Sequence, residues 1–182
     1  LEKENQAVIT NYDFDFVIGS THVVKQVDIY YPAYYEGRNE EDCYREYFEE
    51  TLKNAQSNVD FDVYGHLDYV VRYGPNKNKF YSYQKYADVI DEILRTLIQK
   101  GKGLELNTAG FKYGLGHAHP IIPVLKRYKE LGGEIITLGS DGHAPEQIAW
   151  DFDKVPSILK EAGFEHFTVF HNRKPEFHKI TI

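Results

Sequence analysis

The chain has 182 residues, 42% hydrophobic and 15% aromatic, so it is long enough for one domain with a core of its own. Its net charge of −7 argues against general nucleic-acid binding, which requires a basic face, and no apolar run approaches the roughly 18 residues of a membrane span. Cys43 is the one cysteine, which excludes a disulfide within the chain and fits a reducing compartment such as the cytoplasm.

Apolar and β-branched runs alternate along the chain with segments of helical spacing. A short polar helix is expected over residues 1–11. The predicted strands cover residues 14–21, 61–65, 104–107, 134–139 and 166–170. The predicted helices begin after Asn39, Ser82, His119 and about Phe152, and they end near residues 55, 100, 131 and 162. Loops are expected over residues 22–38, 66–81 and 108–119, and the tail 172–182 is basic, then apolar, with room for a last short strand.

Strand and helix alternate in the way that is typical of a parallel sheet built from βαβ units, so the predicted fold class is α/β. Five strands are too few for an eight-stranded barrel, which usually needs about 250 residues. Periodicity by itself does not choose between a small open sheet and a piece of a barrel.

Polar side chains follow the predicted strands at their carboxyl ends. His22 follows the first strand, His66 and Asp68 the second, Asn107 ends the third, and an Asp-x-His pair, Asp141 and His143, follows the fourth. Because carboxyl ends of parallel strands share one edge, these side chains are expected to converge there. A single histidine at a strand end is more often a core or capping group. Repeated His and Asp at successive strand ends instead favour a Zn, Fe or Mn site.

Two cations near these ends are candidate substrate-binding residues. Arg72 lies six residues after His66, Lys112 follows the turn after the third strand, and guanidinium is suited to bidentate phosphate binding. The alternative for each is a solvated surface charge. Asn107 is expected to hydrogen-bond the substrate or a metal-bound water.

Other polar clusters are weaker candidates. His117 and His119 are expected to form an exposed loop pair or a helix-entry cap rather than metal ligands, and His171 is expected on the surface. The basic stretch 77–79 is too short to indicate nucleic acid in an acidic protein. Cys43 is expected to pack in the core, since no neighbour would activate its thiol.

Four segments in chain order resemble the polymerase-and-histidinol-phosphatase (PHP) family, and within it the histidinol-phosphatase branch. They are Phe14–His22 (FDFVIGSTH), Gly65–Asp68 (GHLD), Leu104–Gly110 (LELNTAG) and Gly139–His143 (GSDGH). The resemblance implies a distorted seven-stranded (β/α) barrel with up to three divalent metals, Zn, Fe or Mn, at its C-terminal face. It implies hydrolysis of a phosphate ester, in this branch L-histidinol phosphate, in histidine biosynthesis.

The resemblance also implies roles for individual residues. By the match, His22, His66, Asp141 and His143 are metal ligands, and Arg72 binds phosphate. Metals held there would lower the pKa of a water to give the hydroxide nucleophile, and no side chain stands out as the general acid.

The sequence departs from the family pattern at its beginning. The family opens with a His-x-His motif, followed by another His and an acidic ligand, and none of these lies before residue 14. With methionine absent, this predicts that residues 1–182 form the C-terminal part of one barrel domain, truncated at its N-terminus. The missing segment of the same enzyme is then an expected partner, and the piece itself is expected to bind metal poorly.

Three alternative functions stay open to different degrees. One is a PHP phosphoesterase with another phosphate substrate, and a second is a non-catalytic α/β domain that lacks essential ligands. A nucleotide-binding module is disfavoured, because no Gly-x-Gly-x-x-Gly follows the first strand.

Overall fold

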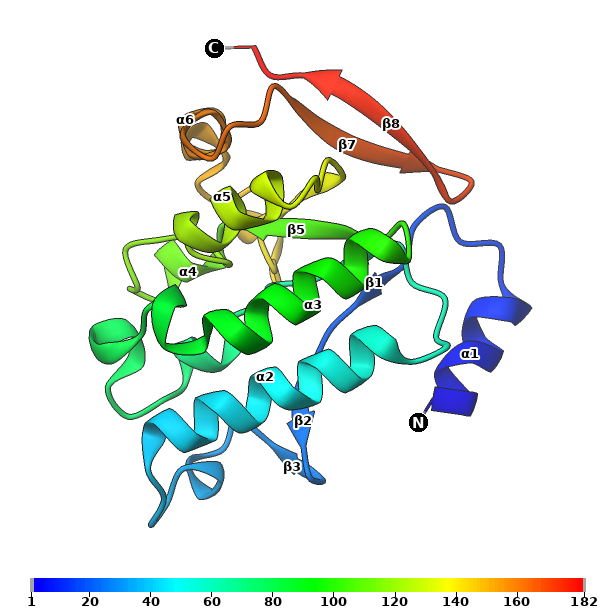
Figure 1. Ribbon diagram of the computed structural model, residues 1–182. Coiled ribbons are helices and arrows are strands. Elements are labelled where there is room, and N and C mark those ends of the chain that lie inside the picture. Colours follow the sequence, from blue (N-terminus) through cyan, green and yellow to red (C-terminus); the bar gives the residue numbers. More distant parts are fainter. Residues whose placement is uncertain (1, 182) are drawn as a thin grey trace.

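A computed structural model describes residues 2–181 and places four short strands in one parallel sheet, in the order β1-β4-β5-β6 (Figure 1). The strands are β1 (Ile18–Gly19), β4 (Val63–Tyr64), β5 (Gly103–Asn107) and β6 (Ile136–Gly139). All three strand pairings are parallel, which confirms the predicted α/β class. Within residues 2–181 the sheet is open and does not close into a barrel.

Apart from the short α4, which lies in the segment 108–119 that was expected to be a loop, the helices lie where the sequence places them, with small shifts at their ends. Helices α2, α3 and α5 cover one face of the sheet, and α6 packs on α5 (Figure 1). The helices are α1 (Glu2–Asn11), α2 (Glu40–Gln56), α3 (Ala87–Gln99), α4 (Ala109–Lys112), α5 (Ile122–Glu130) and α6 (Val155–Glu161).

Capping explains one correct helix start and one wrong one. The Asn39 side chain accepts hydrogen bonds from the backbone amides of Glu41 and Asp42, as its position predicts. Ser82, predicted to cap the next helix, makes no side-chain cap hydrogen bond, because a 3₁₀ turn (Tyr83–Tyr86) precedes α3. Gly101 ends this segment with φ +66°, a conformation that glycine adopts without strain.

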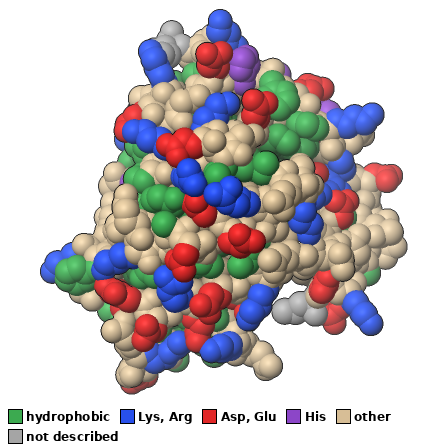
Figure 2. All heavy atoms as spheres, viewed as in Figure 1, with side chains coloured by type: hydrophobic (Ala, Val, Ile, Leu, Met, Phe, Trp, Pro, Cys, Tyr) green, Lys and Arg blue, Asp and Glu red, His purple; other side chains and the backbone are tan. Residues whose placement is uncertain are grey.

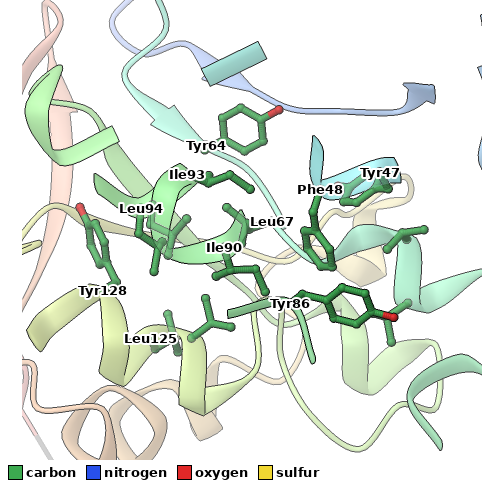
Figure 3. Close-up of a cluster of buried hydrophobic side chains, with 14 of the residues drawn as sticks. Tyr47, Phe48, Tyr64, Leu67, Tyr86, Ile90, Ile93, Leu94, Leu125 and Tyr128 are labelled. Carbon is green, nitrogen blue, oxygen red and sulfur yellow. The ribbon is translucent and has the colours of Figure 1, made fainter. Parts of the chain in front are cut away.

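The hydrophobic core lies between the sheet and this helical layer. Leu104 and Leu106 of β5 are fully buried there. Figure 3 shows aromatic and aliphatic side chains that α2, α3 and α5 contribute to this core, among them Phe48, Ile90 and Leu125. Alternation along the strand turns Glu105 and Asn107 to the opposite face of the sheet. One face of the sheet is therefore apolar, and the other carries buried polar groups.

Two segments differ from the sequence-based expectation. The predicted fifth strand is β7 (His166–His171), but it pairs antiparallel with β8 (Lys174–Lys179) instead of joining the parallel sheet. The tight turn at Asn172 and Arg173, both at positive φ, returns the chain directly, whereas a parallel pairing needs a crossover. The loop predicted over residues 22–38 contains the small hairpin of β2 (Val23–Val24) and β3 (Val27–Asp28).

On the face that Figure 2 shows, acidic and basic side chains are interspersed, and neither kind gathers in one large patch. No helix within residues 2–181 combines the length and the hydropathy that crossing a membrane requires. Short 3₁₀ helices occupy several of the loops, and that of Tyr69–Arg72 contributes to the site described next.

Candidate functional site

His22 and His66 meet at the carboxyl ends of neighbouring strands β1 and β4. Their Nε2 atoms lie 3.3 Å apart, and their ring centroids lie 5.1 Å apart. Burial lowers the pKa of His22, and burial together with the neighbouring His22 lowers the pKa of His66 to about 3. Both imidazoles are therefore neutral near pH 7, the state in which imidazole binds a metal.

The two rings fit a shared metal ion. Two imidazole nitrogens bound to one tetrahedral zinc lie about 3.3 Å apart, because each Zn–N bond is about 2.0–2.1 Å long. His66 sits at φ +26°, a conformation that a non-glycine residue adopts only where its surroundings impose it, and its Nδ1 is buried without a hydrogen-bond partner. The spacing of the paired Nε2 atoms matches that of two ligands of one metal ion, and Nδ1 of His66 would then carry the ring proton.

Glu105 holds the backbone of this site and was missed by the sequence reasoning. Its Oε2 accepts hydrogen bonds from the His66 amide at 2.9 Å and from Asn107 Nδ2 at 3.0 Å. Burial raises the pKa of its carboxyl group. The available signal was a charged residue between Leu104 and Leu106, which alternation places on the polar face of the sheet.

Arg72 and Asp141 form an ion pair beside the histidines. Arg72 Nη1 lies 2.7 Å from Asp141 Oδ2, and the Arg72 side chain is only 1% exposed. Burial alone would raise the pKa of Asp141 and lower that of Arg72. Their mutual attraction outweighs it, so the pKa of Asp141 is lowered and that of Arg72 raised. Arg72 is buried, so the alternative of a solvated surface charge is wrong.

The Arg72 guanidinium is held between two tyrosine rings. Its Cζ lies 4.6 Å from the Tyr69 centroid and 4.2 Å from the Tyr113 centroid. Tyr69 also stacks on His66, with centroids 4.3 Å apart. Arg72 Nε and Nη2 are buried and have no hydrogen-bond partner, so two donors remain for an anion. Sequence reasoning missed these tyrosines, which carry no spacing signal of their own.

The loop after β6 places its two candidate ligands differently. Asp141 adopts φ +47° and keeps its carboxylate at the site, while the His143 side chain is 76% exposed and its Nδ1 lies 3.0 Å from the Asp141 carbonyl oxygen. Lys112 Nζ donates to that carbonyl at 3.0 Å and to Gln147 Oε1 at 2.9 Å. The lysine thus fixes this loop.

The predicted ligands do not close into one cage in the described structure. Within residues 2–181, no three His, Cys, Asp or Glu side chains form a group that could hold a metal ion. The structure brings His22 to His66, and Asp141 to Arg72 and Lys112, while the His143 ring stays exposed, with its Nδ1 3.9 Å from Asp141 Oδ1. The His22–His66 pair is the part of the predicted ligand set that the structure brings together.

His119 is buried, so the exposed loop pair expected from the sequence is wrong for this residue. Its side chain is 0% exposed, and its Nδ1 lies 2.5 Å from Asp68 Oδ1, which is also fully buried. The Asp68 carboxylate accepts a second hydrogen bond from the Ile121 amide at 3.0 Å. The backbone of His119 pairs with Asn107 at the end of β5, which draws the loop against the sheet.

A cavity of about 1090 Å³ opens beside β1, the edge strand of the sheet. Residues of α1, β1 and α2 line it, and His22 is the candidate ligand that reaches it. Ile18 on this edge is 48% exposed. His22 is therefore open on the side away from β4, while His66 is buried.

The family follows from comparison with known proteins. The model of the PHP domain matches residues 1–109, more than half of the chain. The chain belongs to the PHP family. The parallel sheet of this PHP chain carries the candidate site residues at the carboxyl ends of its strands.

Similar proteins extend the match over the whole chain. The histidinol-phosphatase of Lactococcus lactis is 33% identical over 182 residues, which are 100% of this chain and 67% of the relative. A probable histidinol-phosphatase of Clostridium acetobutylicum is 30% identical over 165 residues, 91% of this chain and 64% of the relative. This PHP chain thus spans about two thirds of the length of these relatives.

A solved structure agrees in fold. The crystal structure of the Lactococcus lactis enzyme, complexed with zinc, L-histidinol and phosphate, has a TM-score of 0.81 and 31% identity, and covers 96% of this chain and 66% of that chain. A putative histidinol phosphatase of Listeria monocytogenes, with a TM-score of 0.66 and 17% identity, shares the fold. The zinc in the first of these agrees with a metal-dependent family.

Proposed function

We propose that this PHP protein is a metal-dependent phosphomonoesterase that hydrolyses L-histidinol phosphate to L-histidinol and phosphate. One observation carries the proposal: the His22–His66 nitrogen pair lies beside a buried Arg72 with two unsatisfied donors. The similarity to a histidinol-phosphatase solved with zinc, L-histidinol and phosphate supports this choice of substrate.

The metal would be held by His22 and His66, with Asp141 and His143 completing the ligands of this chain. Arg72 engages Oδ2 of Asp141, so Oδ1 of the same carboxylate can still bind a metal. His143 would have to turn inward from its exposed position. A divalent ion in such a site supplies a hydroxide near neutral pH and offsets charge on the phosphoryl oxygens.

The remaining residues orient the substrate. Arg72 would bind phosphate oxygens through Nε and Nη2, and its stacking between Tyr69 and Tyr113 fixes the plane of the guanidinium. Asn107 and Lys112 stay predicted substrate-binding residues. Their present hydrogen bonds, to Glu105 and to the Asp141 carbonyl, also hold the site in place.

The candidate ligands of this chain do not complete a metal site by themselves. The unpaired edge of β1 leaves room for a further segment that carries the remaining ligands. A segment that pairs with β1 would enter the cavity that His22 lines. We propose that such a segment, of the same enzyme, supplies the remaining ligands. Intact mass and metal content per chain, compared with those of a longer form, test this.

The activity test measures phosphate released from L-histidinol phosphate by the zinc- or manganese-loaded longer form, which carries the remaining ligands. Phosphoserine and p-nitrophenyl phosphate serve as comparison substrates, and the Lactococcus lactis enzyme serves as positive control. We expect preference for L-histidinol phosphate and no activity in Asp141→Ala. Retained activity of Asp141→Ala with normal metal content would overturn the site, and preference for another phosphate would support a different PHP phosphoesterase.

A further inference from the structure

A row of tyrosine rings runs from the histidine pair to the surface. Tyr69 contacts the rings of His22 and His66, and Tyr73 meets Tyr69 edge to face, with centroids 5.1 Å apart. Tyr30 then meets Tyr73 with centroids 5.2 Å apart and an interplanar angle of 71°. We call Tyr69, Tyr73 and Tyr30 the tyrosine wall.

The outer part of this wall is exposed to solvent. The Tyr30 side chain is 57% exposed, and Tyr31, which packs edge to face on it, is 56% exposed. Exposed aromatic rings held in fixed mutual orientation lose water readily and present their π faces to a ligand. Tyr73 and Tyr30 therefore offer a preformed contact surface next to Arg72.

An acidic group lies at the same end of the wall. Asp28 Oδ1 accepts a hydrogen bond from the Tyr30 amide at 2.8 Å, and Asp28 pairs with Val23, the residue after His22, in the β2–β3 hairpin. Among residues 2–181, no Lys or Arg nitrogen lies within 4 Å of the Asp28 carboxylate, and the ion pairs there involve other acidic residues. A half-buried carboxylate beside aromatic faces is suited to an organic cation.

We propose that Tyr30, Tyr73 and Asp28 bind the cationic, imidazole-bearing end of the substrate while Arg72 binds its phosphate. This rests on the proposed function, and it assigns the residues that select among phosphate esters. A protonated imidazole or ammonium gains from the ring faces and from the carboxylate, whereas a neutral alkyl or sugar phosphate gains from neither.

The test uses L-histidinol, which carries the cationic end without the phosphate. Its affinity for the 182-residue protein is measured by NMR titration, without metal and independently of hydrolysis. We expect Tyr30→Leu, Tyr73→Leu and Asp28→Asn each to weaken binding by about three- to tenfold. Tyr73→Phe keeps the ring face and is expected to retain the affinity. The exposed Tyr12→Leu, distant in sequence from the wall, is the matched control.

Inorganic phosphate, titrated separately, distinguishes failure of the two proposals. Suppose that L-histidinol binds and that its affinity depends on the tyrosine wall, but that inorganic phosphate binds the wild type no more tightly than it binds Arg72→Leu. The assignment of the wall then stands, and the phosphate half of the proposed function fails. If Tyr30→Leu and Tyr73→Leu bind L-histidinol as the control does, or if L-alaninol binds as tightly as L-histidinol, the assignment of the wall is overturned.

Discussion

His119→Ala tests whether the buried Asp68–His119 pair stabilises the fold beneath the site. The substitution leaves a carboxylate that is 0% exposed with the Ile121 amide as its remaining donor. Burial lowers the pKa of His119, so the contact at pH 7 is a neutral imidazole on a carboxylate. A net hydrogen bond to a charged group contributes about 1.5–3 kcal/mol, and truncating a fully buried side chain adds the cost of the cavity it leaves. We therefore expect a loss of about 3 kcal/mol, a large part of the roughly 5–15 kcal/mol of a typical domain.

Urea unfolding of the metal-free protein measures this loss. With a slope of about 2 kcal/mol per molar, the midpoint should fall by about 1.5 M at pH 7 with the slope unchanged. His178→Ala is the control, because that histidine lies on the exposed strand β8, and a change within about 0.5 kcal/mol is expected. In wild type, His119 overcomes burial and keeps the pKa of Asp68 low. Without it, Asp68 should take up a proton more readily, so the difference from wild type should shrink toward pH 5. A midpoint indistinguishable from that of the control would refute the reasoning.

Three further outcomes are expected. Glu105→Ala removes the acceptor of the His66 amide and should weaken zinc binding about 10- to 100-fold in a chelator competition, with circular dichroism to confirm the fold. Gly139→Ala would place a Cβ 1.9 Å from Glu105 Oε1, so it should destabilise the protein by about 1–3 kcal/mol, and much less in the Glu105→Ala background. The lowered pKa values of His22 and His66 mean that the unfolded chain binds more protons below pH 6.5. Stability of the metal-free protein should therefore be full above about pH 7 and fall as pH drops through 6.5, and a flat profile from pH 7 to 5 would contradict it.

The features predicted correctly are those that a short segment determines. Asn39 caps α2 because its side chain reaches amides two and three residues ahead, and Gly101 ends α3 because it adopts a positive φ. Strand pairing is not local in this sense. The apolar run of β7 is the same whether it pairs in parallel or antiparallel, and the turn at Asn172 and Arg173 decides the outcome.

The convergence of the site was predictable only as far as the strand ends. His22 and His66 follow two strands that pair in parallel, and the rule about carboxyl ends brings them together. The ion pair of Arg72 with Asp141 joins residues 69 positions apart through loop geometry, and no spacing rule gives it. The burial of His119 likewise depends on its backbone pairing with Asn107, which the loop pattern conceals.

The two faces of β5 connect the fold to the chemistry. Leu104 and Leu106 are buried against the helices, while Glu105 binds the backbone of the His66 turn and Asn107 binds the backbone at Ala109. A polar side chain in that position costs free energy unless its hydrogen bonds are made, and here they are made to the His66 amide and the Ala109 amide. The same bonds that satisfy the buried groups thus hold His66 at its strained φ. An exchange of Glu105 for an apolar residue would leave the core face intact and release the site, so stability and metal affinity should respond separately to changes on the two faces of one strand.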